Sequence, residues 1–557
     1  MKIFTLLLFL TCSQLCFPQA SLSEEEKIEK LIQVWGLLKY QHPEVSRGEF
    51  NINAEFLTQL EKLKRTDSRK EFNSQLLDWV ESFDSKKLNP KKNWKKRDKL
   101  FSKNADFDWI AKSDFSKDLQ ALLEKVQFNK NYKDHYASVH SLASFVEFEN
   151  DKPLEDFETT NKAHRLLFLA HFWNAMKYWN VNIDLTETPW NQVLSEMIPE
   201  FSKDDPEAFE FAKEKIFSKL NDSHANYYPS HTLNSLTHFP NFGGRLINDS
   251  LVVTRIFNED SIKRNKISVG DIIHYVEGVK LGKYYTNKFS QVISVSNKNY
   301  LKNEIQNSYL LASDKDSIKV GVLKNNGDKV EQYIPLNILK NSYEKYRRKH
   351  PEKTENWKML SGHIGYINLY EITKDELDAA FEKFNETKGI IIDLRNYPKN
   401  ISTGTLPKYL YPCRKKFVKA LAPEFPAYGE PDYKSPLRWI MNPFAAGKRN
   451  KNYYKGKVVL LVDRSTLSKA EWIGMAIQAA PNVITVGEQT GGAVLNRNKI
   501  RLMDSTSIDF TKMTAFYPDG REVQRNGLQL DHEIQESAKN YNKDLYLEKA
   551  MEIIEMP

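Results

Sequence analysis

A serine in the last third of the chain stands where a nucleophile gains most from its surroundings. Ser468 follows the apolar run Lys457 to Val462, which has the pattern of a buried strand, and a short polar turn. The segment after Ser468 has a wide apolar face and ends at Pro481, which predicts a helix. A serine at such a turn holds its hydroxyl clear of the sheet, and the free N–H groups of the helix start can bind a developing oxyanion. Ser468 is therefore a candidate nucleophile, although most serines before helices are only N-caps.

A serine hydroxyl is a poor nucleophile at neutral pH and needs a positioned base. Histidine has an ordinary pKa of about 6.5, so it can take the proton and return it to a leaving amine. Ser223 and His224 form part of a polar turn that follows a helical segment beginning at Lys203. On its own the pair is typical of a capping turn. His224 becomes a candidate base only because Ser468 needs one.

Other chemistries find little support in the residue pattern. The 12 histidines contain no His-Glu-x-x-His spacing, so we expect no metal, and we expect no cofactor. Cys413 has no thiol-enzyme motif around it and is interpreted as a structural thiol. The net charge of +8 comes from basic and acidic residues scattered along the chain, and no nucleic-acid-binding signature is present. Nucleic acid is therefore not an expected partner.

The chain has 557 residues, 40% of them hydrophobic and 28% charged, as in a soluble globular protein of two to four domains. Residues 1–20 contain one basic residue, an apolar core and a small residue at Ala20, which predicts a signal peptide. Cys12 and Cys16 fall inside this segment, so the mature chain would keep only Cys413 and form no internal disulfide. We expect an exported protein, periplasmic or extracellular after signal-peptide removal, without a membrane span. The oligomeric state does not follow from the sequence.

The helices and strands that must position these residues fall into three regions after the predicted signal peptide. Residues 21–235 have mainly helical periodicity. Residues 240–340 read as short strands separated by polar turns, and 355–545 alternate strands with helices, which predicts βαβ units around a parallel sheet. The predicted fold class is an α/β catalytic domain with a helical N-terminal region and a small β-rich domain.

Several phrases, taken together, resemble the C-terminal-processing (tail-specific) family of serine peptidases. In chain order they are IGYINL, GIIIDLRNYP, SKAE, VGEQTGG and GLQLDHEI. The phrase ISVGDIIHYVEGVKL, within 240–340, is similar to the strand and turn signature of PDZ domains, which bind extended peptides at a sheet edge. The resemblance covers roughly residues 160 to 540. It implies a catalytic domain of the crotonase/ClpP-like class and a peptide or protein substrate.

In this family Ser468 matches the nucleophile of the Ser-x-x-Glu phrase. Many members pair it with a lysine 25 residues later, where this chain has Ala493, and Lys499 stands at the wrong spacing. The tricorn-like branch instead uses a histidine from a Ser-His pair upstream of the PDZ-like module. The phrase LNDSHANYY resembles that motif, so the resemblance implies His224 as the base and Ser223 as the residue that orients it.

A late glutamate completes the site in the tricorn-like branch. Glu522 is the candidate, with Glu471 and Glu533 as rivals, and Glu471 is better suited to the helix start or a structural bond. The resemblance also implies an oxyanion hole made by the backbone N–H groups of Lys469 and Lys399. The family commonly has Pro-Gly-Gly where this chain has Pro398-Lys399-Asn400, and only glycine adopts positive φ freely.

The sequence thus predicts an exported serine-type endopeptidase that hydrolyses peptide bonds through an acyl-enzyme on Ser468. The alternative is a non-catalytic protein that binds a peptide or an apolar ligand on the same scaffold, because one fold can host either catalysis or binding. The altered turn at Lys399 motivates this alternative.

Overall fold

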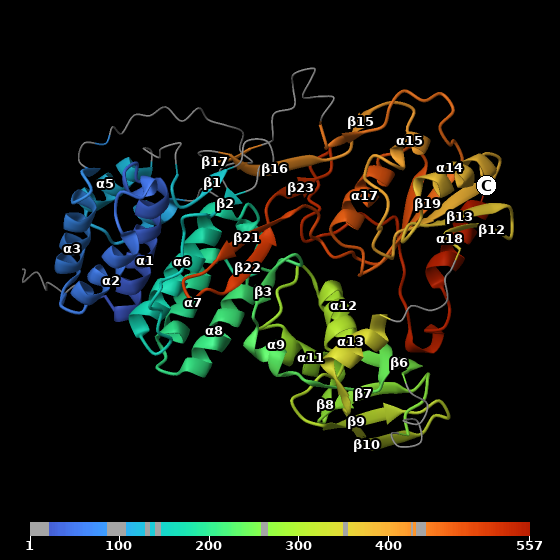
Figure 1. Cartoon of the computed structure of the whole chain (residues 1–557), viewed down its shortest axis with the longest axis horizontal. Coiled ribbons are helices and arrows are strands. Elements are labelled where there is room, and N and C mark those ends of the chain that lie inside the picture. The colour runs from blue at the N-terminus through green and yellow to red at the C-terminus, as the bar shows by residue number, and fades with distance from the viewer. Residues whose placement is uncertain are drawn as a thin grey trace, which may run out of the picture.

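The computed structural model describes residues 22–85, 88, 107–127, 134–139, 146–257, 266–348, 355–424, 427–429 and 442–556. The predicted signal peptide lies outside the described residues. Within them, no helix combines the length and apolar character that crossing a bilayer requires. Figure 1 shows a helical N-terminal region, a middle β-rich region and an α/β region, with β3, β21 and β22 between them.

Helices dominate the N-terminal region, in agreement with the sequence pattern. They are α1 (Glu24–Gln41), α2 (Ile52–Leu63), α3 (Arg69–Glu81), α4 (Asp108–Lys112), α5 (Lys117–Gln127), α6 (Lys162–Trp179), α7 (Trp190–Ser202), α8 (Pro206–Ser218) and α9 (His231–Ser235). Short strands β1 (Ser138–Val139) and β2 (Val146–Glu147) pair antiparallel beside them. Helix α1 begins with a capping box between Ser23 and Glu26, and α6 is buried on nearly all sides. Most of these helices share one hydrophobic core.

A buried charged cluster ties α1 and α6 together. Lys39 Nζ donates to Asp151 Oδ1 at 2.7 Å, and the His171 ring contacts Asp151 Oδ2 at 2.7 Å. Burial would raise the pKa of Asp151, but His171 and Lys39 hold it well below its usual range. The cluster fixes the segment that enters α6, and α6 leads through α7 and α8 to the turn that carries His224.

An antiparallel sheet forms the middle region, with the strand order β10-β9-β7-β6-β5 and β8 paired to β7. Its strands are β5 (Phe242–Ile247), β6 (Ser250–Ile256), β7 (Ile272–Val276), β8 (Val279–Lys280), β9 (Ser317–Leu323) and β10 (Lys329–Pro335). Helices α11 (Leu281–Phe289), α12 (Lys298–Ser308) and α13 (Lys340–Arg348) and strands β4 (His238–Phe239) and β11 (Ile338–Leu339) accompany it. The sequence predicts four of these strands but not α11 and α12, because the polar run 281–308 shows only scattered apolar residues.

A six-stranded sheet, β12-β13-β14-β19-β20-β24, forms the centre of the α/β region. The strands are β12 (Trp357–Leu360), β13 (Ile364–Asn368), β14 (Gly389–Asp393), β19 (Lys457–Val462), β20 (Val483–Gly487) and β24 (His532–Glu533). All neighbours pair parallel except β12 with β13. The parallel βαβ prediction is therefore confirmed.

Helices cover both faces of this sheet, as parallel sheets require. Alternate strand residues pack with α14 (Lys374–Lys383), α15 (Pro407–Leu410) and α17 (Lys469–Gln478) on one face and with α18 (Leu545–Glu555) on the other. Outside it lie β15 (Lys415–Lys416), β16 (Lys419–Glu424), β17 (Ala427–Gly429), β18 (Ala445–Ala446) and β23 (Thr514–Phe516). The region is thus a mixed α/β fold.

A small three-stranded sheet connects the first and last regions. It has the order β21-β22-β3, with β21 (Arg497–Arg501), β22 (Ser507–Thr511) and β3 (Asn226–Tyr228), and both pairs are antiparallel. Strand β3 directly follows His224, and β21 follows the loop that packs against Ser468. This pairing brings two segments more than 200 residues apart to one place, as the sequence of either segment alone does not predict.

Candidate active site

Ser468 occupies a strained turn between β19 and α17. Its backbone has φ 61° and ψ −118°, a conformation that L-residues rarely adopt. Its N–H donates to Ala493 O at 3.1 Å and to Glu471 Oε2 at 3.3 Å. Such a conformation costs about 1–3 kcal/mol and persists only where neighbouring groups impose it. A serine at a sharp strand-to-helix turn presents its hydroxyl above the sheet, which is the geometry of an exposed nucleophile.

The buried carboxylate of Glu471 stabilises this turn. Its carboxylate accepts bonds from Thr490 Oγ1 at 2.6 Å, Gly492 N at 2.8 Å and Ala493 N at 3.0 Å, and it is fully buried. Burial raises the pKa of Glu471 to about 7, and the bonds from these donors oppose the rise. Glu471 therefore makes the structural bonds that the sequence favours for it, and it joins the Ser468 turn to the loop 490–493.

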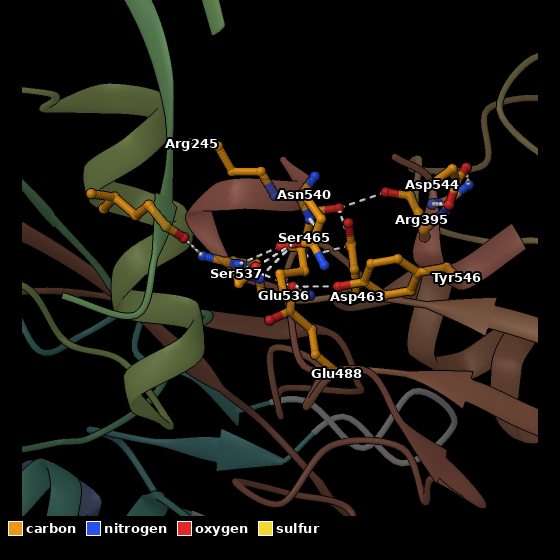
Figure 2. A network of polar contacts seen from close by, with 12 residues as sticks. Arg245, Arg395, Asp463, Ser465, Glu488, Glu536, Ser537, Asn540, Asp544 and Tyr546 are labelled. Carbon is orange, nitrogen blue, oxygen red and sulfur yellow. Dashed lines mark hydrogen bonds and ion pairs between the residues drawn. The ribbon is translucent and has the colours of Figure 1, made fainter. Parts of the chain in front are cut away.

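A polar network fixes the chain just before Ser468 (Figure 2). Arg464 Nε donates to Glu488 Oε1 at 2.9 Å, and its Nη1 donates to Leu246 O, at the end of β5, at 2.7 Å. Arg245, the preceding residue on β5, forms an ion pair with Glu536 at 2.8 Å. The turn that leads to Ser468 is therefore attached to the edge strand of the middle sheet.

His224 is buried two residues before β3, with 5% of its surface exposed. Its Nδ1 lies 3.2 Å from Thr511 Oγ1, and its backbone N–H donates to Asp222 Oδ1 at 3.0 Å. Burial lowers the pKa of His224 to about 4; Asp222 opposes this shift and Arg497 adds to it. The imidazole is therefore neutral at pH 7, as a general base must be.

Ser468 and His224 line the same cleft, which has a volume of about 760 Å³. Tyr227, Tyr300 and Arg497 also line it. The walls come from the His224 turn with β3, from α12 and from β21, so all three regions of the chain contribute. The structure thus brings the two main predicted residues to one cavity.

The other predicted members of the site are placed differently. Ser223 also lines the cleft, but its Oγ accepts from Ser296 N at 2.9 Å and its own N–H donates to Ser296 Oγ at 3.0 Å. Glu522 is half-buried in a turn beside β23 and is not among the residues that line the cleft in the described part of the chain. Glu533 is exposed on β24. Among the hydrogen bonds between described residues, those of Ser223 go to Ser296, and none joins its side chain to His224.

The two predicted oxyanion donors, the N–H groups of Lys469 and Lys399, differ in their hydrogen bonding. Lys469 is the first residue of α17, where an N–H has no partner within the helix. Lys399 N–H instead donates to Tyr370 O at 2.9 Å, so in this structure it is not free to bind an oxyanion. The Lys469 ammonium donates to Pro398 O at 2.9 Å and to Lys399 O at 3.2 Å, which holds the 398–399 turn against the start of α17.

Thr511 and Asp222 are the residues that sequence reasoning missed. Thr511 stands 287 positions from His224, at the end of β22, in a phrase without a recognisable motif. Asp222 adjoins the predicted Ser-His pair in the polar turn that follows the helical segment. Only the pairing of β22 with β3 could have shown that the threonine reaches the histidine. Among the described residues, no group of three or more His, Cys, Asp or Glu side chains could hold a metal ion.

Comparisons with known proteins bear on the family and the fold of the chain. Residues 363–534 match the model of peptidase family S41. No curated protein matches the chain in sequence. The fold is similar to that of mature CPAF complexed with lactacystin, with a TM-score of 0.52 and 11% identity over 70% of this chain and 97% of that one. Mature CPAF without that compound gives the same TM-score and identity over 70% and 96%.

A photosystem II D1 C-terminal processing protease is 15% identical over 67% of this chain and 93% of its own, with a TM-score of 0.35. The fold and the family match define the class as a serine-type hydrolase with a mixed α/β fold and a helical N-terminal region. Residues 363–534 of the chain therefore match peptidase family S41, and the family assignment rests on this α/β region.

Proposed function

We propose that this protein is an endopeptidase in which Ser468 is the nucleophile and His224 the general base. The observation that carries the proposal is that a serine on a strained strand-to-helix turn and a neutral, buried histidine line one cleft. Strain of this kind gathers at functional sites, and a neutral imidazole is ready to accept a proton. The arrangement supports the tricorn-like branch of the family over the lysine-dependent one, because Ala493 is buried at the lysine position.

The mechanism follows from these two side chains. The Ser468 hydroxyl attacks the carbonyl carbon of the scissile peptide bond while the free imidazole nitrogen of His224 takes its proton. The resulting oxyanion is stabilised by the N–H of Lys469 at the start of α17. His224 then gives the proton to the leaving amine, which yields an acyl-enzyme on Ser468. A water molecule, deprotonated in turn by His224, releases the acid product and restores the serine.

The region 240–340 is proposed to act as a PDZ-like module that binds the substrate peptide, and 355–545 as a crotonase/ClpP-like catalytic domain. The edge position of β5 beside helix α12 supports the first part, because an extended peptide can add to a sheet edge. Leu246 is not available to such a peptide, because its N–H donates to Gln306 Oε1 and its carbonyl accepts from Arg464. Export through the leader at residues 1–20 completes the proposal and places the substrates outside the cytoplasm.

The second candidate function is binding without turnover. The engagement of Lys399 N–H by Tyr370 favours it, because a serine hydrolase with a single oxyanion donor loses transition-state stabilisation. Loss of one donor typically lowers kcat by about 10²–10³-fold.

Hydrolysis of an unfolded protein separates the two functions. We expect the full mature chain to cleave a fluorescently labelled, denatured casein into fragments with new amino termini, which mass spectrometry identifies. Tight binding of the casein with no new termini after long incubation would establish the binding protein and exclude the endopeptidase.

The rate of serine labelling should depend on pH in a way set by His224. The neutral imidazole is the competent base, so reactivity is present above its pKa and is lost as the pH falls through it. Because the pKa of His224 is about 4, the rate of phosphonylation by a fluorophosphonate should stay on its plateau down to about pH 5.5. An acid limb near the ordinary histidine value of about 6.5 that persists in Glu471→Gln would contradict this description of the site.

The buried carboxyl of Glu471 has a pKa of about 7, so a limb near neutral pH that disappears in Glu471→Gln belongs to Glu471 and not to His224. Glu471→Gln cannot titrate at this position and identifies any such limb. Circular dichroism over the same pH range confirms that the fold persists.

A further inference from the structure

We propose that Thr511 and Asp222 fix the tautomer and orientation of His224, in the place of the expected serine and glutamate. This inference rests on the proposed function for its catalytic meaning, but its geometry stands by itself. His224, Thr511 and Asp222 are 5%, 0% and 3% exposed, so the arrangement is shielded from water. Both residues are positioning residues, because they act through the imidazole.

The hydrogen bonds of Asp222 determine the direction of the relay. Thr511 Oγ1 lies 2.7 Å from Asp222 Oδ1, and Thr511 N–H donates to Asp222 Oδ2 at 2.6 Å. A hydroxyl has one proton, and a carboxylate only accepts, so the threonine proton must go to Asp222. Thr511 Oγ1 can then offer only a lone pair to the histidine. Consequently the nitrogen that faces it, His224 Nδ1 at 3.2 Å, must carry a proton.

The tautomer follows from that assignment. With the proton on Nδ1, the neutral imidazole has its lone pair on Nε2. The Nδ1 edge is turned to Thr511, and His224 also lines the cleft that contains Ser468. We infer that the Nε2 edge is the one directed to the cleft. Nε2 is therefore the nitrogen that can accept the serine proton. The same division of labour between the two ring nitrogens operates in serine hydrolases that use an aspartate directly.

Asp222 also supports the charged state that forms during the reaction. Two hydrogen bonds hold Asp222 in place. Its N–H donates to Ser294 Oγ at 3.0 Å, and its Oδ1 accepts from His224 N–H at 3.0 Å. The negative charge of Asp222 favours the imidazolium, while Arg497 across the cleft disfavours it. Asp222 thus takes over the electrostatic part that the sequence assigned to Glu522.

The hydrogen bonds of Ser223 give it a different role from the one that the sequence predicts. Its hydroxyl accepts from the backbone N–H of Ser296, in the segment that leads into α12. Ser223 therefore holds the turn beside His224 to the middle region, and Thr511 is the side chain whose hydroxyl meets the ring.

Nitrogen NMR of the full mature chain, labelled with ¹⁵N in its histidine rings, tests the tautomer without requiring any turnover. The His224 signals are assigned by their absence from His224→Gln. We expect Nδ1 to be protonated and Nε2 unprotonated at pH 7. In Thr511→Val, which keeps the shape but loses the hydroxyl, the two tautomers should become mixed. Thr511→Ser should restore the single tautomer.

Kinetics form the second readout. Thr511→Val should lower kcat on the order of 10- to 100-fold with little change in KM, since the buried hydrogen bond that orients the ring is lost. Thr511→Ser should recover most of that activity. Thr506→Val is the matched control, because Thr506 makes the same kind of bond to Asp504, at 2.6 Å, outside the cleft.

The outcomes separate this inference from the proposed function. A protonated Nε2 in the native chain, or a tautomer that changes in Ser223→Ala but not in Thr511→Val, overturns the relay. A protonated Nδ1 that depends on Thr511, in a chain without any hydrolysis, upholds the relay and refutes the peptidase. If Thr511→Val does not fold, the native chain and Thr511→Ser still decide the tautomer.

Discussion

His224→Ala should abolish peptide hydrolysis, with kcat lower by a factor on the order of 10⁴–10⁶. In the proposed mechanism the imidazole performs both proton transfers, from Ser468 to the ring and from the ring to the leaving amine. Removal of the ring leaves the oxyanion donor and substrate binding, which sustain only residual catalysis. Initial rates on a fluorogenic peptide, with thermal unfolding as a check of the fold, measure the loss.

Lys499→Ala is the matched control for that variant. Lys499 lines the same cleft and is exposed on β21, so the two substitutions change the same cavity. An exposed lysine that does not take part in proton transfer should alter kcat by no more than about threefold. The reverse pattern, with Lys499→Ala inactive and His224→Ala active, would restore a serine–lysine mechanism.

Ser468→Ala should remove covalent catalysis, with a loss in kcat on the order of 10⁶-fold. Alanine keeps the Cβ atom and therefore tolerates the φ of 61° no worse than serine does. The network around Glu471 receives its bond from the backbone N–H of residue 468, which the substitution keeps. We therefore expect an unchanged melting temperature together with lost hydrolysis. Hydrolysis that persists in Ser468→Ala, after removal of contaminating proteases, would assign the chemistry to another residue.

Much of the α/β region could be predicted because its signals are local. The run Lys457–Val462 is a strand with the predicted bounds, and a helix follows Ser468 as its apolar face indicates. Parallel pairing follows from alternation of strands and helices, since each helix returns the chain to the same edge. The candidate nucleophile could be predicted for the same reason, because its strand, turn and helix lie within a few residues of one another.

The arrangement around His224 could not be predicted, because it depends on pairing between distant strands. Thr511 and His224 meet only because β22 pairs with β3, and no local pattern specifies that contact. The family pattern pointed to Ser223, yet the backbone of Ser296 holds its hydroxyl. The hydrogen bond from Lys399 N–H to Tyr370 O could not be predicted for a different reason. The direction of a backbone N–H in an irregular turn depends on φ and ψ rather than on residue type.

Covalent labelling of Ser468 is the most direct test of the proposed function. The folded chain at pH 7 is treated with a fluorophosphonate, digested, and its peptides are sequenced by mass spectrometry. We expect one phosphonyl group per chain, on Ser468, and no adduct at that position in His224→Ala under the same exposure. An unlabelled native chain, or a modification that maps to another residue, would contradict the assignment of Ser468 as the nucleophile.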